Sequence, residues 1–403
     1  RIMKILVLNC GSSSLKYQVL DMKDDNDYTL LAKGLVERIG LEKGDVTHRP
    51  TGKDRYCISE PIPDHTAGIR IVLSLLTDPV HGVLSSLGEI EAVGHRVAHG
   101  GELFPESCLV DQKVIDGIES LCELAPLHNP ANLLGIRAAS ELMPSVPQVA
   151  VFDTSFHQTM PEEAYLYAIP YEYYEKYRVR RYGFHGTSHK YVSAKAAALC
   201  GLDLGKSRII TCHLGNGSSI TAIKDGKSID TSMGFTPTEG VVMGTRCGNI
   251  DCGVVTFLQE KEGLTPAQVT SLLNKKSGLQ GISGTSSDCR DLVDAAASGN
   301  KRAALALAAL ESSVLKYIGS YAAEMGGVDL IIFTGGIGEN NPDMRRDICT
   351  KLAFMGVEWN EAANAGVKGE DKILTAPDSK VKVMCVSTNE ELVIARDTMR
   401  LSK

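Results

Sequence analysis

The sequence lacks any run of 18 uncharged apolar residues, the length that a membrane-spanning helix requires. It also has no excess of positive charge, because 42 Lys and Arg stand against 49 Asp and Glu, giving a net charge of -7. This balance offers no basic surface for a phosphate backbone, so we expect neither a membrane nor a nucleic acid as partner. The apolar run Ile5 to Leu8 is too short for the core of a signal peptide, which predicts a cytoplasmic protein.

Paired cysteine motifs are missing as well. The eleven cysteines extend from Cys10 to Cys385 without a C-x-x-C pair. An odd number without paired spacing argues against a disulfide framework and against a structural zinc site. We expect reduced thiols, mostly buried as small apolar side chains.

The chain does have the length and composition of a globular protein with more than one domain. Its 403 residues are 43% apolar and 23% charged, enough for two or three domains that each bury a core. Strands alternate with helices in both halves, which predicts α/β layers with a mixed sheet in each domain. The predicted strands are 5–9, 17–20, 30–34, 149–152, 208–213, 219–224, 228–230 and 330–334, and the predicted helices are 67–76, one from Pro130, 301–325 and 389–399. Segment 278–300 is rich in Gly, Ser and Asp and is predicted to be an exposed loop.

One pattern of strand, Gly/Ser turn and strand occurs twice. It runs from Ile5 to Ser14 in the first half and from Ile209 to Ser219 in the second. Backbone N–H groups at such turns converge on an anion, and Ser hydroxyls add donors, so two copies across a cleft predict one polyphosphate ligand. The alternative is two unrelated β-turns, since Gly and Ser are common in turns.

A third glycine-rich segment, Thr334 to Asn340, follows a predicted strand and precedes a helix expected to start at Asn341-Pro342. Backbone at such a position can contact a nucleotide. It is not a dinucleotide fingerprint, because Asn341 stands where the third Gly should be. Segment Gly201 to Ser207 resembles a P-loop, but it has one residue too few between its glycines and precedes a strand, which indicates a surface turn.

Polar groups that bind or move charge are concentrated in five segments, 94–102, 126–130, 152–157, 181–189 and 243–246. Each histidine in them has an alternative role as a hydrogen-bonded structural residue. Spacing of i, i+4 would allow His185 and His189 to bind a metal, but Gly186 argues against a helix there. Loop arginines beside glycine, Arg96 and Arg246, suit bidentate contact with a carboxylate or phosphoryl group, the alternative being surface salt bridges.

Several motifs resemble those of the acetate kinase (acetokinase) family, in the superfamily of acetate and sugar kinases, heat-shock proteins and actin. The first is Leu8-Asn9-Cys10-Gly11-Ser12-Ser13-Ser14-Leu15-Lys16, and the second is His213-Leu214-Gly215-Asn216-Gly217-Ser218-Ser219. Phe184 to His189 and Thr388 to Glu391 add to the match, which extends from Met3 to nearly the end of the chain.

The resemblance implies reversible phosphoryl transfer from ATP to acetate, giving acetyl phosphate and ADP, with Mg²⁺, or Mn²⁺ in its place. A loose transition state for phosphoryl transfer needs charge stabilisation, which cationic side chains and a metal supply. Acetate is already ionised near pH 7, so Asp153 is expected to orient the metal or phosphoryl group rather than remove a proton. The implied roles are catalytic for Asp153, Arg246 and His185; substrate binding for Arg96, Ala98, Leu127, Phe184, Pro237 and His128; metal binding for Asn9 and Glu390; and nucleotide binding for Lys16, Ser12, His213, Leu214, Gly215, Asn216, Gly217, Asp288, Cys289, Arg290, Gly336, Ile337, Gly338, Glu339 and Asn340.

Two positions depart from the family pattern. Ala98 stands where acetate kinases usually carry Val, which could admit propionate, because one methylene is worth only about 1 to 3 kcal/mol of discrimination. Neighbouring side chains that fill the gap are the alternative. The usual Ser-Gly-Asp-x-Asp-Pro after Arg246 is here Cys247-Gly248-Asn249-Ile250-Asp251-Cys252, which could loosen the loop that aims Arg246.

The resemblance further implies two ribonuclease H-like (actin-like ATPase) domains related by duplication, with the active site in the interdomain cleft. We predict an N-terminal domain of residues 3–152 plus 387–403 and a nucleotide-binding domain of residues 153–386. A homodimer is also implied. The rival activities are a propionate or butyrate kinase of the same family and, outside it, a nucleotide-gated binding protein of the actin or heat-shock type.

Overall fold

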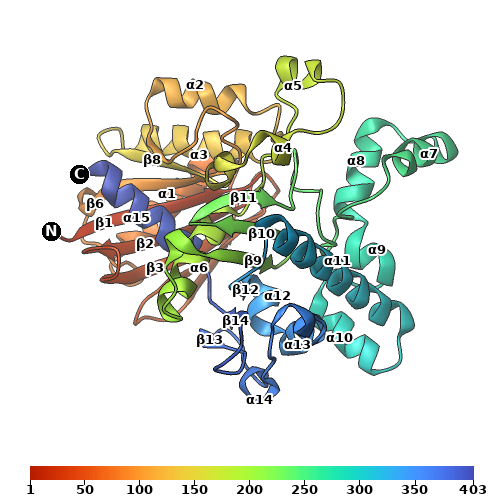
Figure 1. Cartoon of the computed structure of the whole chain (residues 1–403). Helices are drawn as coiled ribbons and strands as arrows, with labels where there is room; N and C mark the ends of the chain where they lie inside the picture. Colours follow the sequence, from red (N-terminus) through yellow and green to blue (C-terminus); the bar gives the residue numbers. More distant parts are fainter. The chain divides into compact units, whose positions relative to one another are not determined.

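The computed structural model describes all 403 residues, and the chain forms two compact units. Unit 1 consists of Arg1–Ser155 and Asn389–Lys403, and unit 2 consists of Phe156–Thr388. The chain thus leaves unit 1 just after Asp153 and returns to it with its last helix (Figure 1).

Unit 1 is built on an eight-stranded sheet with the order β5-β4-β3-β2-β1-β6-β8-β7. The central strand β1 is buried along most of its length, as expected for a strand covered on both faces, and it pairs antiparallel with β2 and parallel with β6. The strand bounds are β1 Met3–Cys10, β2 Leu15–Met22, β3 Tyr28–Glu37, β4 Gly44–Pro50, β5 Tyr56–Glu60, β6 Ile90–Val97, β7 Cys108–Leu109 and β8 Gln148–Phe152.

Helices cover this sheet from two sides. Residues of α1 (His65–Leu76) and α3 (Asn129–Leu142) share one core with Leu6 and Leu8 of β1. The last helix, α15 (Glu390–Ser402), packs against β6, β8, β1 and β2 and is drawn in blue beside the red strands of Figure 1. Gly94 permits this close approach, because a Cβ there would lie 2.3 Å from the Thr398 hydroxyl oxygen. The remaining helix, α2, spans Gln112–Ser120.

Unit 2 contains a six-stranded sheet with the order β11-β10-β9-β12-β14-β13. The long helix α11 (Lys301–Met325) contributes to the larger core, whereas α6 (Gly186–Leu199) packs into a second core with residues of β9 and β12. The strand bounds are β9 Arg208–Leu214, β10 Ser218–Lys224, β11 Lys227–Thr231, β12 Leu330–Thr334, β13 Lys372–Ile373 and β14 Lys382–Cys385.

The two sheets repeat one topology. In unit 1 the order β3-β2-β1-β6-β8 has three antiparallel strands followed by two parallel ones, and β11-β10-β9-β12-β14 in unit 2 is arranged identically. The parallel pairs β6–β8 and β12–β14 complete each copy. This repetition confirms the predicted fold class, two duplicated α/β units.

Smaller elements complete the chain, and some correct the predictions from sequence. Segment 278–300 is not a loop, because it contains α9 (Gly278–Ser283) and α10 (Cys289–Ala297) and buries Leu279 and Leu292 in the core. The Asp288 carboxylate accepts a hydrogen bond from the Arg290 backbone and so caps α10, a role for which Asp is favoured. The other bounds are α4 Glu162–Tyr165, α5 Glu172–Tyr177, α7 Cys252–Glu262, α8 Pro266–Lys275, α12 Gly335–Asn340, α13 Pro342–Cys349, α14 Glu361–Asn364, and the 3₁₀ helices η1 Leu87–Glu89, η2 Ser155–Thr159, η3 Leu204–Lys206 and η4 Thr350–Met355.

All eleven cysteines are free thiols, as predicted, and no helix reaches the length and apolarity needed to span a bilayer. The expectation that most thiols are buried is wrong. Five are buried, four are half-buried, and Cys57 and Cys252 are exposed.

Candidate active site

In unit 1 the expected residues meet where strands of the sheet end. Asn9 near the end of β1 lies opposite Lys16 on β2, and Ser12 is exposed in the turn between them. Arg96 lies near the end of β6, not in a loop as predicted, because Ile90–Val97 forms a mostly buried strand paired on both sides. Asp153 directly follows β8.

Arg96 and Asp153 form the principal ion pair of this site. Arg96 donates from Nε to Oδ1 of Asp153 at 2.9 Å and from Nη2 to Oδ2 at 2.6 Å, a bidentate contact. Asp153 is 3% exposed, whereas Arg96 is 32% exposed. The neighbouring Asp153 carboxylate raises the pKa of Arg96. Since Nε and Nη2 hold the carboxylate, Nη1 is left to donate to a further acceptor.

Asn9, Lys16, Arg96 and Glu390 line one cavity of about 370 Å³ within unit 1. Shielding from water raises the pKa of Glu390 to about 7, while Arg96 acts in the opposite direction. Mg²⁺ binds through one or two carboxylates and completes its shell with phosphate and water, so the amide oxygen of Asn9 and the Glu390 carboxylate fit that ion. No group of three or more His, Cys, Asp or Glu side chains forms a complete metal site.

Two buried asparagines that the sequence interpretation missed hold the chain after β6. Asn129 accepts from the His99 backbone N–H at 3.0 Å and donates to the His99 carbonyl at 2.9 Å. Asn132 accepts from the Ala98 N–H at 2.9 Å and donates to the Cys10 carbonyl at 2.7 Å. Asn129 is the first residue of α3, and the N-cap position belongs to His128, one of the expected substrate residues.

The four expected acyl-pocket residues differ in exposure. Ala98 in unit 1 and Phe184 in unit 2 are buried, and Pro237 in unit 2 is half-buried. Leu127 in unit 1 is 60% exposed.

In unit 2 a chain of hydrogen bonds connects two of the expected histidines. Ser219 Oγ lies 2.9 Å from His185 Nδ1 and 2.7 Å from His189 Nε2, and His189 Nδ1 lies 2.5 Å from Thr211 Oγ1. Burial lowers the pKa of His189 well below its usual value, which keeps this ring neutral. The hydroxyl of Ser219 therefore bridges Nδ1 of His185 and a neutral His189 ring.

His185 also adjoins the second phosphate-loop candidate. Its ring stacks on His213 with centroids 4.2 Å apart, and His213 Nδ1 lies 2.8 Å from Ser188 Oγ. The argument from Gly186 against a helix is wrong, because α6 begins at Gly186. His185 occupies the N-cap position of α6 with a φ of 56°. The ring contacts Ser219 of β10 and His213 of β9.

Arg246 lies in a loop and contacts no carboxylate. Its Nη1 donates to the Pro237 carbonyl at 2.9 Å, and burial lowers its pKa. A Cβ at Gly217 would lie 2.8 Å from Arg246 Nη2 and 3.3 Å from His185 Nε2. The two cationic or polar groups therefore converge on the backbone of the loop between β9 and β10, and a side chain at Gly217 would displace them.

The altered segment after Arg246 is held by hydrogen bonds. Asn249 accepts from the Gly240 N–H at 3.0 Å and donates to the Tyr317 hydroxyl at 2.8 Å. Cys247 donates its backbone N–H to the Leu273 carbonyl at 3.0 Å. Asp251 caps α7, whose first residue is Cys252.

Glycine-rich segments of unit 2 lie close together. A Cβ at Gly215 would lie 3.8 Å from the Gly336 backbone nitrogen, and one at Gly244 would lie 2.9 Å from Asn216 Oδ1. The expected loop Gly336–Asn340 is instead part of the short helix α12. Its Glu339 carboxylate accepts from the Gly335 N–H at 2.7 Å, which favours helix over loop.

The expected nucleoside residues have different environments. Asp288 and Arg290 form an ion pair at 2.7 Å, with the Arg290 side chain 90% exposed. The Cys289 side chain is buried in the core and receives a contact from Asn341 Nδ2 at 3.6 Å. Cys289 at the start of α10 thus contacts Asn341, the N-cap of α13, and the Cys289 thiol is shielded from solvent.

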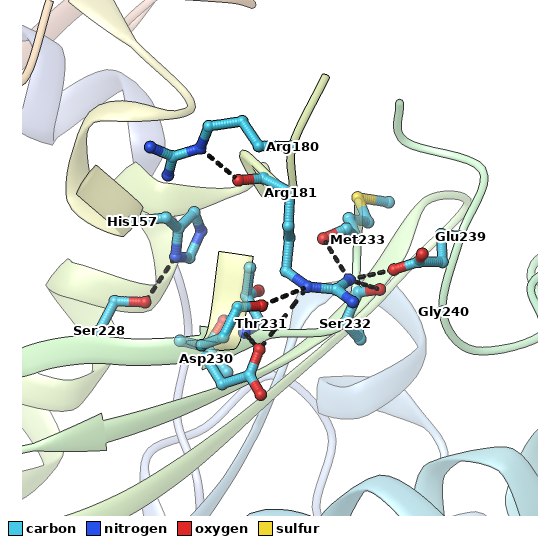
Figure 2. Close-up of polar contacts among 12 residues, drawn as sticks. His157, Arg180, Arg181, Ser228, Asp230, Thr231, Ser232, Met233, Glu239 and Gly240 are labelled. Carbon is cyan, nitrogen blue, oxygen red and sulfur yellow. Dashed lines mark hydrogen bonds and ion pairs between the residues drawn. The ribbon is translucent and has the colours of Figure 1, made fainter. Parts of the chain in front are cut away.

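Arg181 was named in a polar segment but not assigned a role, and it anchors the stretch that leads to His185. Figure 2 shows its guanidinium between Asp230 and Glu239, with the carbonyls of Ser232 and Met233 also in contact. His157 Nδ1 lies 2.7 Å from Ser228 Oγ, and His157 Nε2 lies 2.9 Å from the Phe184 carbonyl oxygen. These contacts fix the backbone on which Phe184 and His185 lie.

Comparison with known proteins identifies the family of this chain. The family model described as the acetokinase family matches residues 4–396. The chain is 58% identical to the acetate kinase of Thermoanaerobacter pseudethanolicus over 402 residues, covering 100% of this chain and 99% of that one. It superposes on the crystal structure of Porphyromonas gingivalis acetate kinase with a TM-score of 0.96 at 50% identity, with both chains fully covered. A propionate kinase from Francisella tularensis gives a TM-score of 0.90 at 41% identity over 99% of this chain and 100% of that one. The chain belongs to the acetokinase family.

Proposed function

We propose that this protein is an acetate kinase, which transfers a phosphoryl group reversibly and directly between ATP and acetate, giving acetyl phosphate and ADP. Membership of the acetokinase family supports the reaction class. The observation that carries the proposal is the convergence of Arg246 and His185 on Gly217, with no carboxylate neutralising Arg246.

In this proposal unit 2 holds the phosphate groups and stabilises the charge that develops during transfer. Backbone N–H groups of the loop His213 to Gly217 bind phosphate oxygens, and α12 contributes contacts through Gly336. Arg246 donates to the oxygens of the phosphoryl group in flight. His185, with one nitrogen fixed by Ser219, offers its other nitrogen to the same group.

Unit 1 holds the acceptor. Arg96 binds the acetate carboxylate through the donors that Asp153 leaves available, and Asp153 fixes the plane of the guanidinium. Both Asp153 oxygens accept from Arg96, so in this proposal Asp153 orients that guanidinium, whereas the resemblance implied that it orients the metal or the phosphoryl group. Asn9 and Glu390 would hold Mg²⁺, which when bound neutralises phosphate charge. Mn²⁺ as a substitute, a homodimer and a cytoplasmic location belong to the same proposal and rest on the family resemblance.

A second candidate, propionate as the preferred acceptor, is favoured by one position. Ala98 is buried and small where the family usually carries Val, so a longer acyl group gains room. The Francisella tularensis relative named as a propionate kinase shares 41% identity.

Trapping of the acyl phosphate with hydroxylamine, in the presence of ATP and Mg²⁺, tests both candidates. We expect turnover with acetate, and kcat/KM for acetate, propionate and butyrate gives the preference. If kcat/KM for propionate equals or exceeds that for acetate, and Ala98→Val restores the preference for acetate, propionate would replace acetate as the proposed substrate. Absence of turnover with all three acids would contradict a carboxylate kinase and favour a nucleotide-gated binding protein.

A further inference from the structure

The cavity of unit 1 extends well beyond the residues assigned to the reaction. Its floor is one face of the sheet, made by alternate residues of the neighbouring strands β1, β2, β3 and β4. Residues that are paired across these strands form two rows. One row is Asn9, Lys16, Leu35 and Thr47, and the other is Val7, Gln18, Lys33 and Arg49. Residues opposite one another in paired strands share a face, so both rows point into the same cavity.

The second row ends in two positive charges that face each other. Lys33 on β3 and Arg49 on β4 are direct register partners, both exposed, and neither has an ion-pair partner in the structure. Like charges directly opposite on adjacent strands destabilise a sheet. An anion placed between the two side chains removes that repulsion.

Acidic side chains lie at the other end of the cavity. Glu390 and Glu391 belong to the first turn of α15, and that helix packs against β6, β8, β1 and β2. Strands are about 4.8 Å apart, so β4 lies about 10 Å beyond β2, the strand that carries Lys16. The cavity therefore has a carboxylate end beside Arg96 and Lys16 and a separate cationic end at Lys33 and Arg49.

We propose that Lys33 and Arg49 form a second anion site, which binds the phosphate group of a small phosphorylated molecule, distinct from the groups at Arg96 and Glu390. Arg49 supplies bidentate N–H donors and Lys33 a point charge, the combination that suits a phosphate dianion. Gln18 and Thr47 add neutral hydrogen-bonding groups from the neighbouring positions of the floor. The whole cavity, reaction end included, has a volume of about 370 Å³, which is the size of a small-molecule site.

Binding is measured on the full-length protein saturated with a non-hydrolysable ATP analogue, so that the phosphate loop proposed for unit 2 is occupied and cannot take the probes. Isothermal titration calorimetry with inorganic phosphate and with glucose 6-phosphate would be compared for the unaltered protein, Lys33→Gln, Arg49→Gln and the double variant. We expect the double variant to weaken binding of both probes about tenfold or more, since it removes the charged donors that hold the phosphate group. Tighter binding of glucose 6-phosphate would identify an organic phosphate as the ligand, and equal affinities a free phosphate ion.

Two matched controls decide whether the effect is local. Lys43→Gln removes an exposed charge of the same unit outside the cavity and is expected to leave both affinities unchanged. Arg96→Gln alters the reaction end and is expected to change them less than threefold. The proposal is overturned if the unaltered protein binds neither probe at tens of millimolar, if Lys43→Gln weakens binding as much as the double variant, or if Arg96→Gln alone abolishes it. Thermal unfolding of each variant excludes loss of fold as the cause.

Discussion

The two units share one sheet topology yet handle charge in opposite ways. In unit 1 the cation of the site, Arg96, is held against the buried carboxylate of Asp153, with Glu390 in the same cavity. In unit 2 the cation Arg246 has only a carbonyl partner, and its surroundings are histidines, hydroxyls and glycine backbone. The framework therefore fixes where strand ends and turns lie, whereas the side chains placed there decide the chemistry. A balanced site suits holding an acceptor, and an unbalanced positive site suits charge that appears during reaction.

The largest effect is expected where unit 2 has no room. Gly217→Ala would place a Cβ 2.8 Å from Arg246 Nη2 and 3.3 Å from His185 Nε2, so both groups must move. We expect kcat to fall about 10²- to 10³-fold, the loss typical of removing one preorganised donor. The measurement is kcat for acetyl phosphate formation. Gly319→Ala, where a Cβ meets no atom within 4 Å, is the control and should retain activity. If Gly217→Ala retains its activity, the positions of Arg246 and His185 beside Gly217 are not required for catalysis.

The next effect concerns the balance of charge in unit 1. Arg96→Ala leaves the buried Asp153 carboxylate without its partner, and breaking such a pair costs about 3 to 5 kcal/mol. Denaturant unfolding should show a loss of this order, reduced because Arg96 is one-third exposed. Addition of Asp153→Asn should restore part of the stability, since it removes the isolated charge. Equal stability of the single and double variants would mean that the pair does not act as a unit.

A smaller effect is expected from the hydroxyl that joins two histidines. Ser219→Ala removes the contacts to His185 Nδ1 and His189 Nε2, so the His185 ring loses this hydrogen bond. We expect kcat to fall about tenfold with little change in the KM for acetate, because His185 acts on the phosphoryl group in this account. A shift in the pH profile of kcat distinguishes this positioning role from loss of packing. Ser219→Thr, which retains the hydroxyl, should recover most of the rate.

The smallest effect concerns a like-charge pair in unit 2, remote from its histidines in sequence. Burial and Asp347 raise the pKa of Glu311 to about 7. The folded state therefore binds a proton more tightly than the unfolded state, and this group's contribution to stability declines as pH rises from about 4.5 to about 7. Glu311→Gln should flatten that decline, raising the midpoint of thermal unfolding relative to the unaltered protein at pH 8 but not at pH 4.5. If the difference in unfolding midpoint between the two proteins is the same at pH 4.5 and pH 8, the raised pKa of Glu311 is contradicted.

Local patterns predicted the framework well. Helix α11 begins and ends at the predicted residues, Lys301 and Met325, because an apolar stripe runs between an Asn cap and a closing glycine. The repeated strand, turn and strand are present in both units. Prediction failed where tertiary contacts overrode composition. Segment 278–300 forms two helices, since buried leucines and an Asp cap outweigh its Gly and Ser content.

The candidate site was found mainly through its motifs, and its supporting contacts were not. Asn129 bonds to His99 across 30 residues, and Arg181 meets Glu239 across 58, so no local pattern contains either pair. Ser219 was noted only as part of a glycine-rich turn, although its hydroxyl joins two histidines. A buried Asn or Arg in the middle of a polar segment is a signal for such a role, but its partner is fixed only by the fold.

The division of labour between the units is tested most directly by comparing Arg96→Lys and Arg246→Lys, which keep the charge but lose the planar fork. Steady-state kinetics with acetate and ATP give kcat and both KM values for each variant. We predict that Arg96→Lys raises the KM for acetate about tenfold or more with kcat nearly unchanged, and that Arg246→Lys lowers kcat about a hundredfold with the acetate KM nearly unchanged. The same parameter moving in both variants would contradict separate roles for the two units.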